Sequence, residues 1–255
     1  MYKELVYGLN FSDLGITGFD ELIGGGVPRG VSVLILYNGD CSWDASVLLG
    51  IICVNLLEKG ETVVCVTNDF PSESYLFRYA AEIAKKAIAE NRLFYIDLFS
   101  ASICDEDYDE PNVIVAPDTT NLSYILYHFH EIRNEKLEST CTDRPVVWCY
   151  DNLSTTFFIV GHDEKCLKFI WNSRRLIKKF GDIFFATMDI QMHDPKVVAT
   201  AKNIFDIVID LESIERKGRT MKYLKVTKNA GRPFELERRQ YTFNPYEKTF
   251  TLKNS

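Results

Sequence analysis

Gly39-Asp40-Cys41-Ser42-Trp43-Asp44-Ala45-Ser46 lies between two apolar runs, Val31–Leu36 and Val47–Leu57. The first run is short and rich in aliphatic residues, which is typical of a buried strand. The second run belongs to a stretch, Ala45–Lys59, that predicts a helix ending at Gly60. The sequence therefore predicts a strand, a turn that begins with glycine and a largely buried helix, in that order.

A phosphate-binding loop with the pattern GxxxxGK[ST] occurs in this arrangement. Gly39 matches the first glycine and Ser46 the closing hydroxyl, but Asp44 replaces the second glycine and Ala45 replaces the lysine. Such a loop needs converging backbone N–H groups and a lysine that neutralises the phosphate charge. Asp44 would repel a triphosphate, and its Cβ occupies space where glycine lets the backbone approach. We therefore predict a vestigial phosphate loop, formed by Gly39, Ser42, Asp44, Ala45 and Ser46.

The segment before the first strand carries a second pattern. Ile16–Gly30 reads I-T-G-F-D-E-L-I-G-G-G-V-P-R-G. It resembles the entry segment of the RecA superfamily, especially of its KaiC-like and RadA-like members, in which T-G-(F/L)-D-x-L-x-G-G-G-(I/V)-P-x-G precedes the first core strand. The match has no gap and stands in the right place before Gly39. The resemblance implies a RecA-like P-loop fold, with residues 1–255 forming a single RecA-like domain.

The order of the remaining elements agrees with this fold class. Apolar runs predict buried strands, and amphipathic stretches between them predict helices, as in βαβ units. The predicted strands are Val31–Leu36, Thr62–Thr67, Leu93–Leu98, Pro145–Asp151, Asp182–Asp189 and Asn203–Leu211, and further predicted helices are Ser72–Glu90, Thr120–Lys136 and Asp163–Phe180. After Thr220 the pattern alternates as in half-exposed antiparallel strands. The sequence thus predicts an α/β fold with a mainly parallel central sheet, flanking helices and antiparallel C-terminal strands.

The charged groups that handle nucleotide in the RecA-like families are only partly present. The strand ending at Asp151 resembles the Walker B strand, so Asp151 is a possible Mg²⁺ ligand if a nucleotide binds. The family's water-activating Glu-Glu pair corresponds to Asp69 and Phe70, and a phenyl ring cannot accept a proton. In the pattern L-K-V-x-K-x-R-G, Lys228 matches the lysine, but Ala230 replaces the arginine that reaches a neighbouring subunit's phosphates. The resemblance therefore implies no catalytic residue, with Asp69, Asp151 and Lys228 as vestiges.

Composition and charge restrict the class of protein. Of 255 residues, 46% are hydrophobic, and the formal net charge is −7, which argues against a mainly electrostatic nucleic-acid binder. Seven cysteines without CxxC spacing indicate buried thiols in a reducing cytoplasm rather than a metal site. The N-terminus shows no signal-peptide pattern, and Val47–Leu57 is too short to span a bilayer. We therefore expect a cytoplasmic protein without a membrane partner.

Local biases add two expectations. The acidic stretch Asp105–Pro111 predicts an exposed loop within Ser102–Pro117. Glutamine occurs only at positions 191 and 240 while lysine and glutamate are plentiful, a bias seen in thermophile proteins.

The interpretation that we favour is a non-catalytic RecA-like protein, a pseudo-ATPase that acts through protein or peptide binding and assembly. Partners of RecA-group proteins dock short segments with aromatic anchors, and Trp43 stands inside the loop where a small residue is expected. The partner is a protein or peptide, such as an active homologue, or a second copy in a homo-oligomer. On this interpretation we expect no cofactor.

Two alternatives remain open at this stage. The chain could bind or hydrolyse ATP with a non-standard loop, in which Lys59 or Lys228 replaces the missing lysine and Ser46 and Asp151 hold Mg²⁺. It could instead be a DNA-binding recombinase paralogue that uses the cations Lys196, Lys202, Arg216, Lys217 and Arg219. The second alternative lacks an aromatic platform for base stacking.

Overall fold

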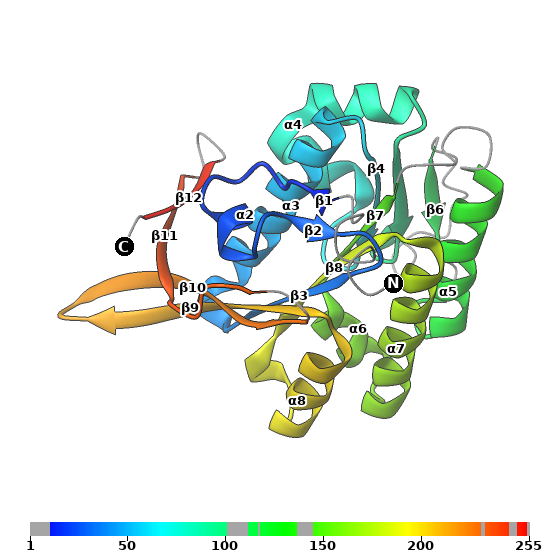
Figure 1. Cartoon of the computed structure of the whole chain (residues 1–255). Coiled ribbons are helices and arrows are strands. Elements are labelled where there is room, and N and C mark those ends of the chain that lie inside the picture. The colour runs from blue at the N-terminus through cyan, green and yellow to red at the C-terminus, as the bar shows by residue number, and fades with distance from the viewer. Residues whose placement is uncertain are drawn as a thin grey trace, which may run out of the picture.

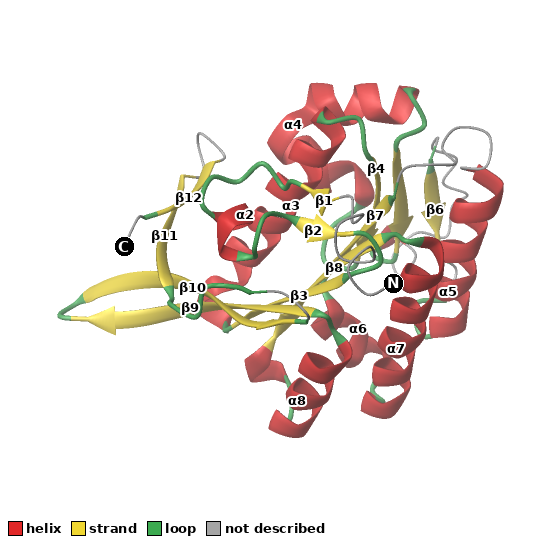
Figure 2. Ribbon diagram, in the orientation of Figure 1, coloured by secondary structure: helices red, strands yellow, loops and turns green. Residues whose placement is uncertain are grey.

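A ten-stranded sheet forms the centre of the molecule, with helices on both faces (Figures 1 and 2). The computed structural model describes residues 11–100, 112–116, 118–136, 145–230, 233–244 and 249–253. The acidic stretch Asp105–Pro111 and the cysteines Cys104 and Cys141 lie outside the described residues.

The sheet is parallel except at its C-terminal side. Its strand order is β12-β11-β10-β9-β3-β8-β7-β4-β5-β6, and every neighbouring pair from β9 to β6 is parallel. The parallel strands are β3 (Ser32–Tyr37), β4 (Thr62–Thr67), β5 (Leu93–Asp97), β6 (Val113–Val115), β7 (Val146–Asp151), β8 (Ile183–Asp189) and β9 (Ile207–Arg216). The antiparallel strands are β10 (Arg219–Asn229), β11 (Arg239–Asn244) and β12 (Thr249–Leu252). This confirms the predicted α/β fold class. The sequence missed β6, which lies in the stretch expected to be a loop.

Two helical layers cover the sheet. One face carries the short α2 (Phe19–Leu22), α3 (Ser42–Glu58) and α4 (Ser72–Ala89); the other carries α5 (Leu122–Glu131), α6 (Leu153–Val160), α7 (Asp163–Phe180) and α8 (Pro195–Ile204). Capping residues define where several of these helices begin and end. Asn152 and Asp194 accept backbone N–H bonds at the starts of α6 and α8, and Gly161 and Gly181 adopt positive φ at the ends of α6 and α7.

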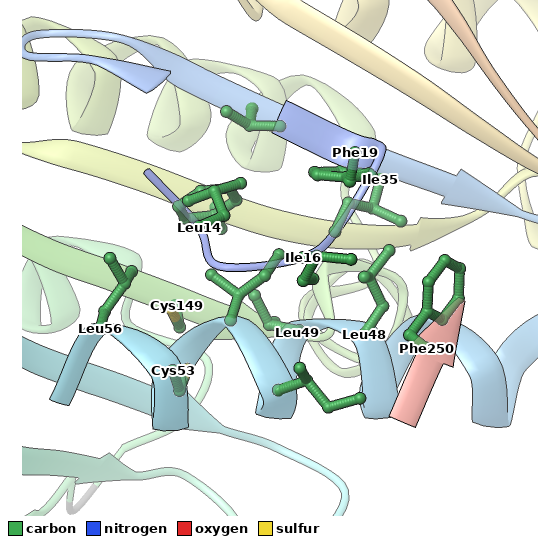
Figure 3. Packing of buried hydrophobic residues seen from close by; sticks show 14 of the residues in the cluster. Leu14, Ile16, Phe19, Ile35, Leu48, Leu49, Cys53, Leu56, Cys149 and Phe250 are labelled. Atoms are coloured by element: carbon green, nitrogen blue, oxygen red, sulfur yellow. The ribbon is translucent and has the colours of Figure 1, made fainter. Parts of the chain in front are cut away.

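The apolar runs form strands because both faces of the sheet are covered. Side chains alternate along β3, so that Val33 and Ile35 join the core under α3, while Leu34 and Leu36 join the core under α7. Figure 3 shows the first of these cores, with Leu48 and Leu49 of α3 packed beside Ile35. By length and composition α3 could cross a membrane, but 67% of its apolar window is buried inside the protein, as in a core helix.

Buried thiols belong to the same core. Cys53 of α3 points toward Cys149 of β7 in Figure 3, and Cys65 of β4 is the register partner of Cys149. All three are buried, and burial raises the pKa of the Cys65 and Cys149 thiols well above the ordinary value. The raised pKa keeps Cys65 and Cys149 as unreactive thiols, in agreement with the burial expected from the sequence.

The glycines of the entry segment allow its backbone to pack closely. The strands β1 (Phe11–Ser12), before α2, and β2 (Val27–Pro28), after it, pair with each other in antiparallel fashion. Gly24, Gly25 and Gly26 all have positive φ, and a Cβ on Gly26 would lie 2.7 Å from the Ser12 carbonyl oxygen. The turn also uses Asp20, whose carbonyl accepts from Gly25 N–H at 2.6 Å and whose carboxylate accepts from Leu14 N–H at 2.9 Å.

Asp20 and Asp13 share this turn as neighbouring carboxyl groups. Burial, together with the charge of Asp13, raises the pKa of Asp20 to about 6. A hydrogen bond with Asp20, together with the Gly15 N–H and Lys59, lowers the pKa of Asp13 to about 2. The entry turn therefore holds one permanent carboxylate, which Lys59 pairs at 3.0 Å, and one carboxyl that titrates near neutral pH.

We expect Asp20→Asn to stabilise the protein at pH 7 by about 1 kcal/mol, after a discount for solvent screening, and to lose that advantage toward pH 4. Between the ordinary pKa of 3.8 and the folded value of about 6, the folded state binds more protons than the unfolded state. Wild-type stability attributable to this group therefore falls as the pH rises through that window. Urea unfolding of both proteins across this range measures the difference. Exposed Glu21→Gln is the control, and a pH-independent difference for Asp20→Asn contradicts the prediction.

Candidate functional site

The carboxyl edge of the sheet brings most of the predicted site residues together. Because β3, β8, β7 and β4 are parallel neighbours, their carboxyl ends lie side by side. Open α/β sheets bind ligands at this edge. Asp69 follows β4, Asp151 ends β7 and Asp189 ends β8. Burial and the charges of Asp151, Asp189 and Asp69 raise the pKa of Tyr37, at the end of β3, above its ordinary range. The edge is thus lined by carboxylates, an electrostatic setting that opposes a bound phosphate.

The predicted loop is shorter than the sequence suggested. After β3 the chain makes one 3₁₀ turn, Gly39–Cys41, and α3 begins at Ser42 rather than at Ala45. Ser42, Asp44, Ala45 and Ser46 therefore lie in the first turns of a helix. The Gly39 N–H donates to Gln191 Oε1 at 3.2 Å, so a side chain of the protein occupies this backbone amide.

Asp44 is buried and paired at the start of α3. Its side chain is 3% exposed and accepts from Lys222 Nζ at 2.7 Å and from the Tyr241 hydroxyl at 2.7 Å. Burial and the charge of Asp44 raise the pKa of Tyr241 above its ordinary range, which keeps this hydroxyl protonated. Lys222 comes from β10 and Tyr241 from β11, so the C-terminal strands hold the start of α3. Ala45, at the position of the expected lysine, is fully buried in the core.

Asp69 faces the start of α6. Its carboxylate accepts from Thr155 Oγ1 at 2.6 Å and from Asn152 Nδ2. Burial raises its pKa, while the Thr155 bond opposes that shift. Asn68 donates to Thr156 Oγ1 at 3.0 Å, which ties the same turn to α6. The side chain that corresponds to the water-activating carboxylate therefore serves as a structural link between β4 and α6.

Asp151 and Asp189 are also engaged with protein groups. Asp151 is buried and accepts from the Thr187 hydroxyl at 2.7 Å. Asp189 accepts from Gln191 N–H at 2.8 Å. In the described part of the chain, no group of three or more His, Cys, Asp and Glu side chains is arranged to hold a metal ion. A Mg²⁺ role for Asp151 stays a prediction.

A serine and a histidine that the sequence did not single out meet beside this edge. Ser154 Oγ lies 2.8 Å from His193 Nε2 and accepts from Asp189 N–H at 2.9 Å. Burial lowers the pKa of His193, so Nε2 of the neutral ring accepts a hydrogen bond from the Ser154 hydroxyl. Because Ser154 is fully buried, the pair fixes α6 against the end of β8 and does not present a nucleophile. Nothing local in the sequence marks two residues 39 positions apart as neighbours.

Lys59 and Lys228 are the suggested replacements for the missing loop lysine. Within one chain, neither of them reaches the carboxyl edge of the sheet. Lys59 follows α3, at the opposite end of that helix from Asp44, and donates to the Asp13 carbonyl at 2.7 Å. Lys228 donates to the carbonyls of Lys202, Asn203 and Phe205 at the end of α8, at 2.9, 3.0 and 2.5 Å. The suggestion that either lysine replaces the missing one is therefore wrong for the isolated chain.

The cations of the proposed nucleic-acid face are dispersed. Arg216, Lys217 and Arg219 occupy the tip of the β9–β10 hairpin, which projects from the body in Figure 1. Lys196 begins α8, and Lys202 lies 3.4 Å from Asp210 in an ion pair. They form no continuous basic groove, which argues against this alternative.

Four exposed apolar side chains lie on segments that follow strands of the carboxyl edge. Trp43 is 47% exposed at the start of α3, Phe158 is 78% exposed on α6, and Ile190 and Met192 are 41% and 54% exposed on the turn after β8. These segments follow β3, β7 and β8, which are adjacent in the sheet. The predicted exposure of Trp43 agrees with the structure.

Comparison of the sequence with family models and with curated proteins finds no match. Comparison of the structure with solved structures finds matches. A crystal structure described as a KaiC-like protein from the hyperthermophilic archaeon Pyrococcus horikoshii superposes with a TM-score of 0.73 at 16% sequence identity. The match covers 96% of this chain and 100% of the other. The chain has a KaiC-like, RecA-type fold. At this identity the likeness establishes the fold, and function has to be argued from the side chains.

We expect Lys222→Gln to destabilise the protein by about 1–3 kcal/mol, because it leaves the buried Asp44 carboxylate without its cation. Asp44→Asn combined with Lys222→Gln should cost less than the sum of the single changes. Lys225→Gln is the control, because this lysine lies on the opposite face of β10. Urea unfolding measures the wild type, Lys222→Gln, Asp44→Asn, the double variant and Lys225→Gln. Equal effects of Lys222→Gln and Lys225→Gln contradict the assignment.

Proposed function

We propose that this KaiC-like protein is non-catalytic and acts by binding another protein at the carboxyl edge of its sheet. The observation that carries the proposal is the Asp44–Lys222–Tyr241 network. A phosphate-binding loop needs open backbone amides and a free lysine at the start of this helix. The network instead places a buried and fully paired carboxylate at the start of α3.

The surrounding residues support the loss of catalysis. Hydrolysis needs a carboxylate free to orient water, and Asp69 is engaged by Thr155 and Asn152. It also needs a cation at the phosphates, and Ala45 is buried where that cation would start. Carboxylates along the same edge add repulsion toward a polyphosphate.

The apolar edge supports the binding role. Trp43, Phe158 and Met192 expose large side chains on adjacent segments, whereas most large apolar side chains of the described residues are buried. Large exposed apolar side chains are a feature of interaction surfaces, and tryptophan is a frequent anchor. The occupant that we propose is a partner protein or a second copy of the chain.

Titration calorimetry with ATP and ADP, with and without Mg²⁺, tests the non-catalytic part. We expect no saturable heat and no thermal stabilisation, which corresponds to a Kd weaker than about 1 mM. Micromolar binding that disappears in Ser46→Ala would contradict the proposal, because this substitution removes the one hydroxyl that the phosphate-loop pattern retains. Thr220→Ala, which removes an exposed hydroxyl on β10 outside the loop, is the control.

Affinity capture and sedimentation of the same protein test the binding part. We compare wild type with Trp43→Ser/Phe158→Ser/Met192→Ser, and use Leu236→Ser, which removes a 71% exposed leucine elsewhere, as the control. A bound protein or a self-associated species should be lost at least about tenfold in the triple variant and kept in the control. A complex equally strong in all three proteins would mean that the edge is not the interface.

A further inference from the structure

A groove between α5 and α7 is separate from the carboxylate-lined edge. These helices run side by side on the same face of the sheet (Figure 1). Between the start of α5 and the first turns of α7 lies a cavity of about 460 Å³, a size typical of small-molecule sites. None of its described lining residues belongs to the vestigial loop or to the apolar edge.

One wall of the groove is basic. Lys165, Lys168 and Asn172 stand at positions i, i+3 and i+7 of α7, which places them on one side of the helix. Both lysines are exposed, and no ion pair or hydrogen bond joins either ammonium group to another described residue. Other surface lysines, such as Lys59 and Lys85, form ion pairs with carboxylates. The absence of such a partner among the described residues therefore distinguishes Lys165 and Lys168.

The floor of the groove is apolar. Phe169 is 3% exposed and Leu122 is 9% exposed, and Leu126 packs partly buried against the same core. An apolar floor below two ammonium groups matches an amphipathic ligand, because burial of its apolar part adds to the attraction of its charge.

The opposite rim sets the orientation of such a ligand. Asp118 accepts from the Thr120 N–H at 2.9 Å and from the Thr120 hydroxyl at 2.6 Å, which keeps its carboxylate charged. Asn121 Oδ1 accepts from Tyr124 N–H and so caps α5, which satisfies one backbone N–H at the helix start. A negative group is therefore repelled from the α5 rim and attracted to the α7 wall.

We propose that the α5–α7 groove binds a small organic anion, with its phosphate or carboxylate group at Lys165 and Lys168 and its apolar part over Phe169. The ammonium groups supply charge-assisted hydrogen bonds, and Asn172 adds an amide donor beside them. This inference goes beyond the proposed function and does not depend on it, because the groove shares no residue with the candidate site.

The test follows the backbone amide signals of Ser123 and Asn172 by NMR during titration with four probes: phenyl phosphate, benzoate, inorganic phosphate and benzyl alcohol. We expect saturable shifts with phenyl phosphate or benzoate, and the stronger of the two identifies the head group. Inorganic phosphate and benzyl alcohol should bind at least about tenfold more weakly, because each lacks one half of the recognition.

Variants locate the binding. Lys165→Gln/Lys168→Gln should weaken the better probe at least about tenfold. Arg175→Gln/Lys179→Gln removes the same charge from the same helix outside the groove and should change the affinity less than about twofold. The proposal is overturned if no probe gives a saturable shift with a Kd below about 10 mM, or if both double variants weaken binding equally. It is also overturned if inorganic phosphate binds as well as phenyl phosphate.

ATP carries phosphate and an apolar base, so it serves as a check between the two proposals. Binding of ATP that Lys165→Gln/Lys168→Gln abolishes and Ser46→Ala leaves unchanged would support the groove. ATP binding that Ser46→Ala abolishes and Lys165→Gln/Lys168→Gln leaves unchanged would contradict the non-catalytic proposal. The probe titrations alone would then decide the groove proposal.

Discussion

Parallel pairing of β3, β8, β7 and β4 is the constraint on which the rest of the structure depends. It requires helical crossovers, which cover both faces of the sheet and bury the strands as continuous apolar runs. It also delivers every strand end to one edge, where Asp69, Asp151 and Asp189 lie near Tyr37. The concentration of carboxylates at that edge is thus a consequence of topology acting on residues far apart in the chain.

The start of α3 shows how a buried carboxylate is accommodated at the position that the sequence likens to a phosphate-binding loop. A buried carboxylate is tolerated only when cations and hydroxyls pair it. Lys222 and Tyr241 meet that requirement for Asp44, and both come from the antiparallel strands that extend the sheet beyond β9. The C-terminal strands therefore have a structural task at the position where a phosphate-binding loop would need open backbone amides.

The two proposed binding surfaces lie on different parts of the molecule. The exposed Trp43, Phe158 and Met192 lie on segments that follow strands of the carboxyl edge, while Lys165 and Lys168 border a groove on the helical layer. The two surfaces differ in chemistry, since one offers apolar area and the other offers charge above an apolar floor. This difference suits two ligands of different kinds and lets each surface be altered without disturbing the other.

Much of the fold was predictable because its signals are local. The buried runs at β3, β4, β7 and β8, the glycine turn before them and the change of period after Thr220 all follow from neighbouring residues. The prediction that Asp44 and Ala45 are unsuited to a phosphate loop also came from local residues, and it stays a prediction. It could not reveal that Lys222 and Tyr241, 178 and 197 positions away, pair with Asp44, or that Ser154 meets His193. Nor could it show that Lys59 and Lys228 are held far from the edge. Hydrogen bonds and ion pairs between distant segments depend on how the strands are ordered in the sheet, so only the tertiary structure decided them.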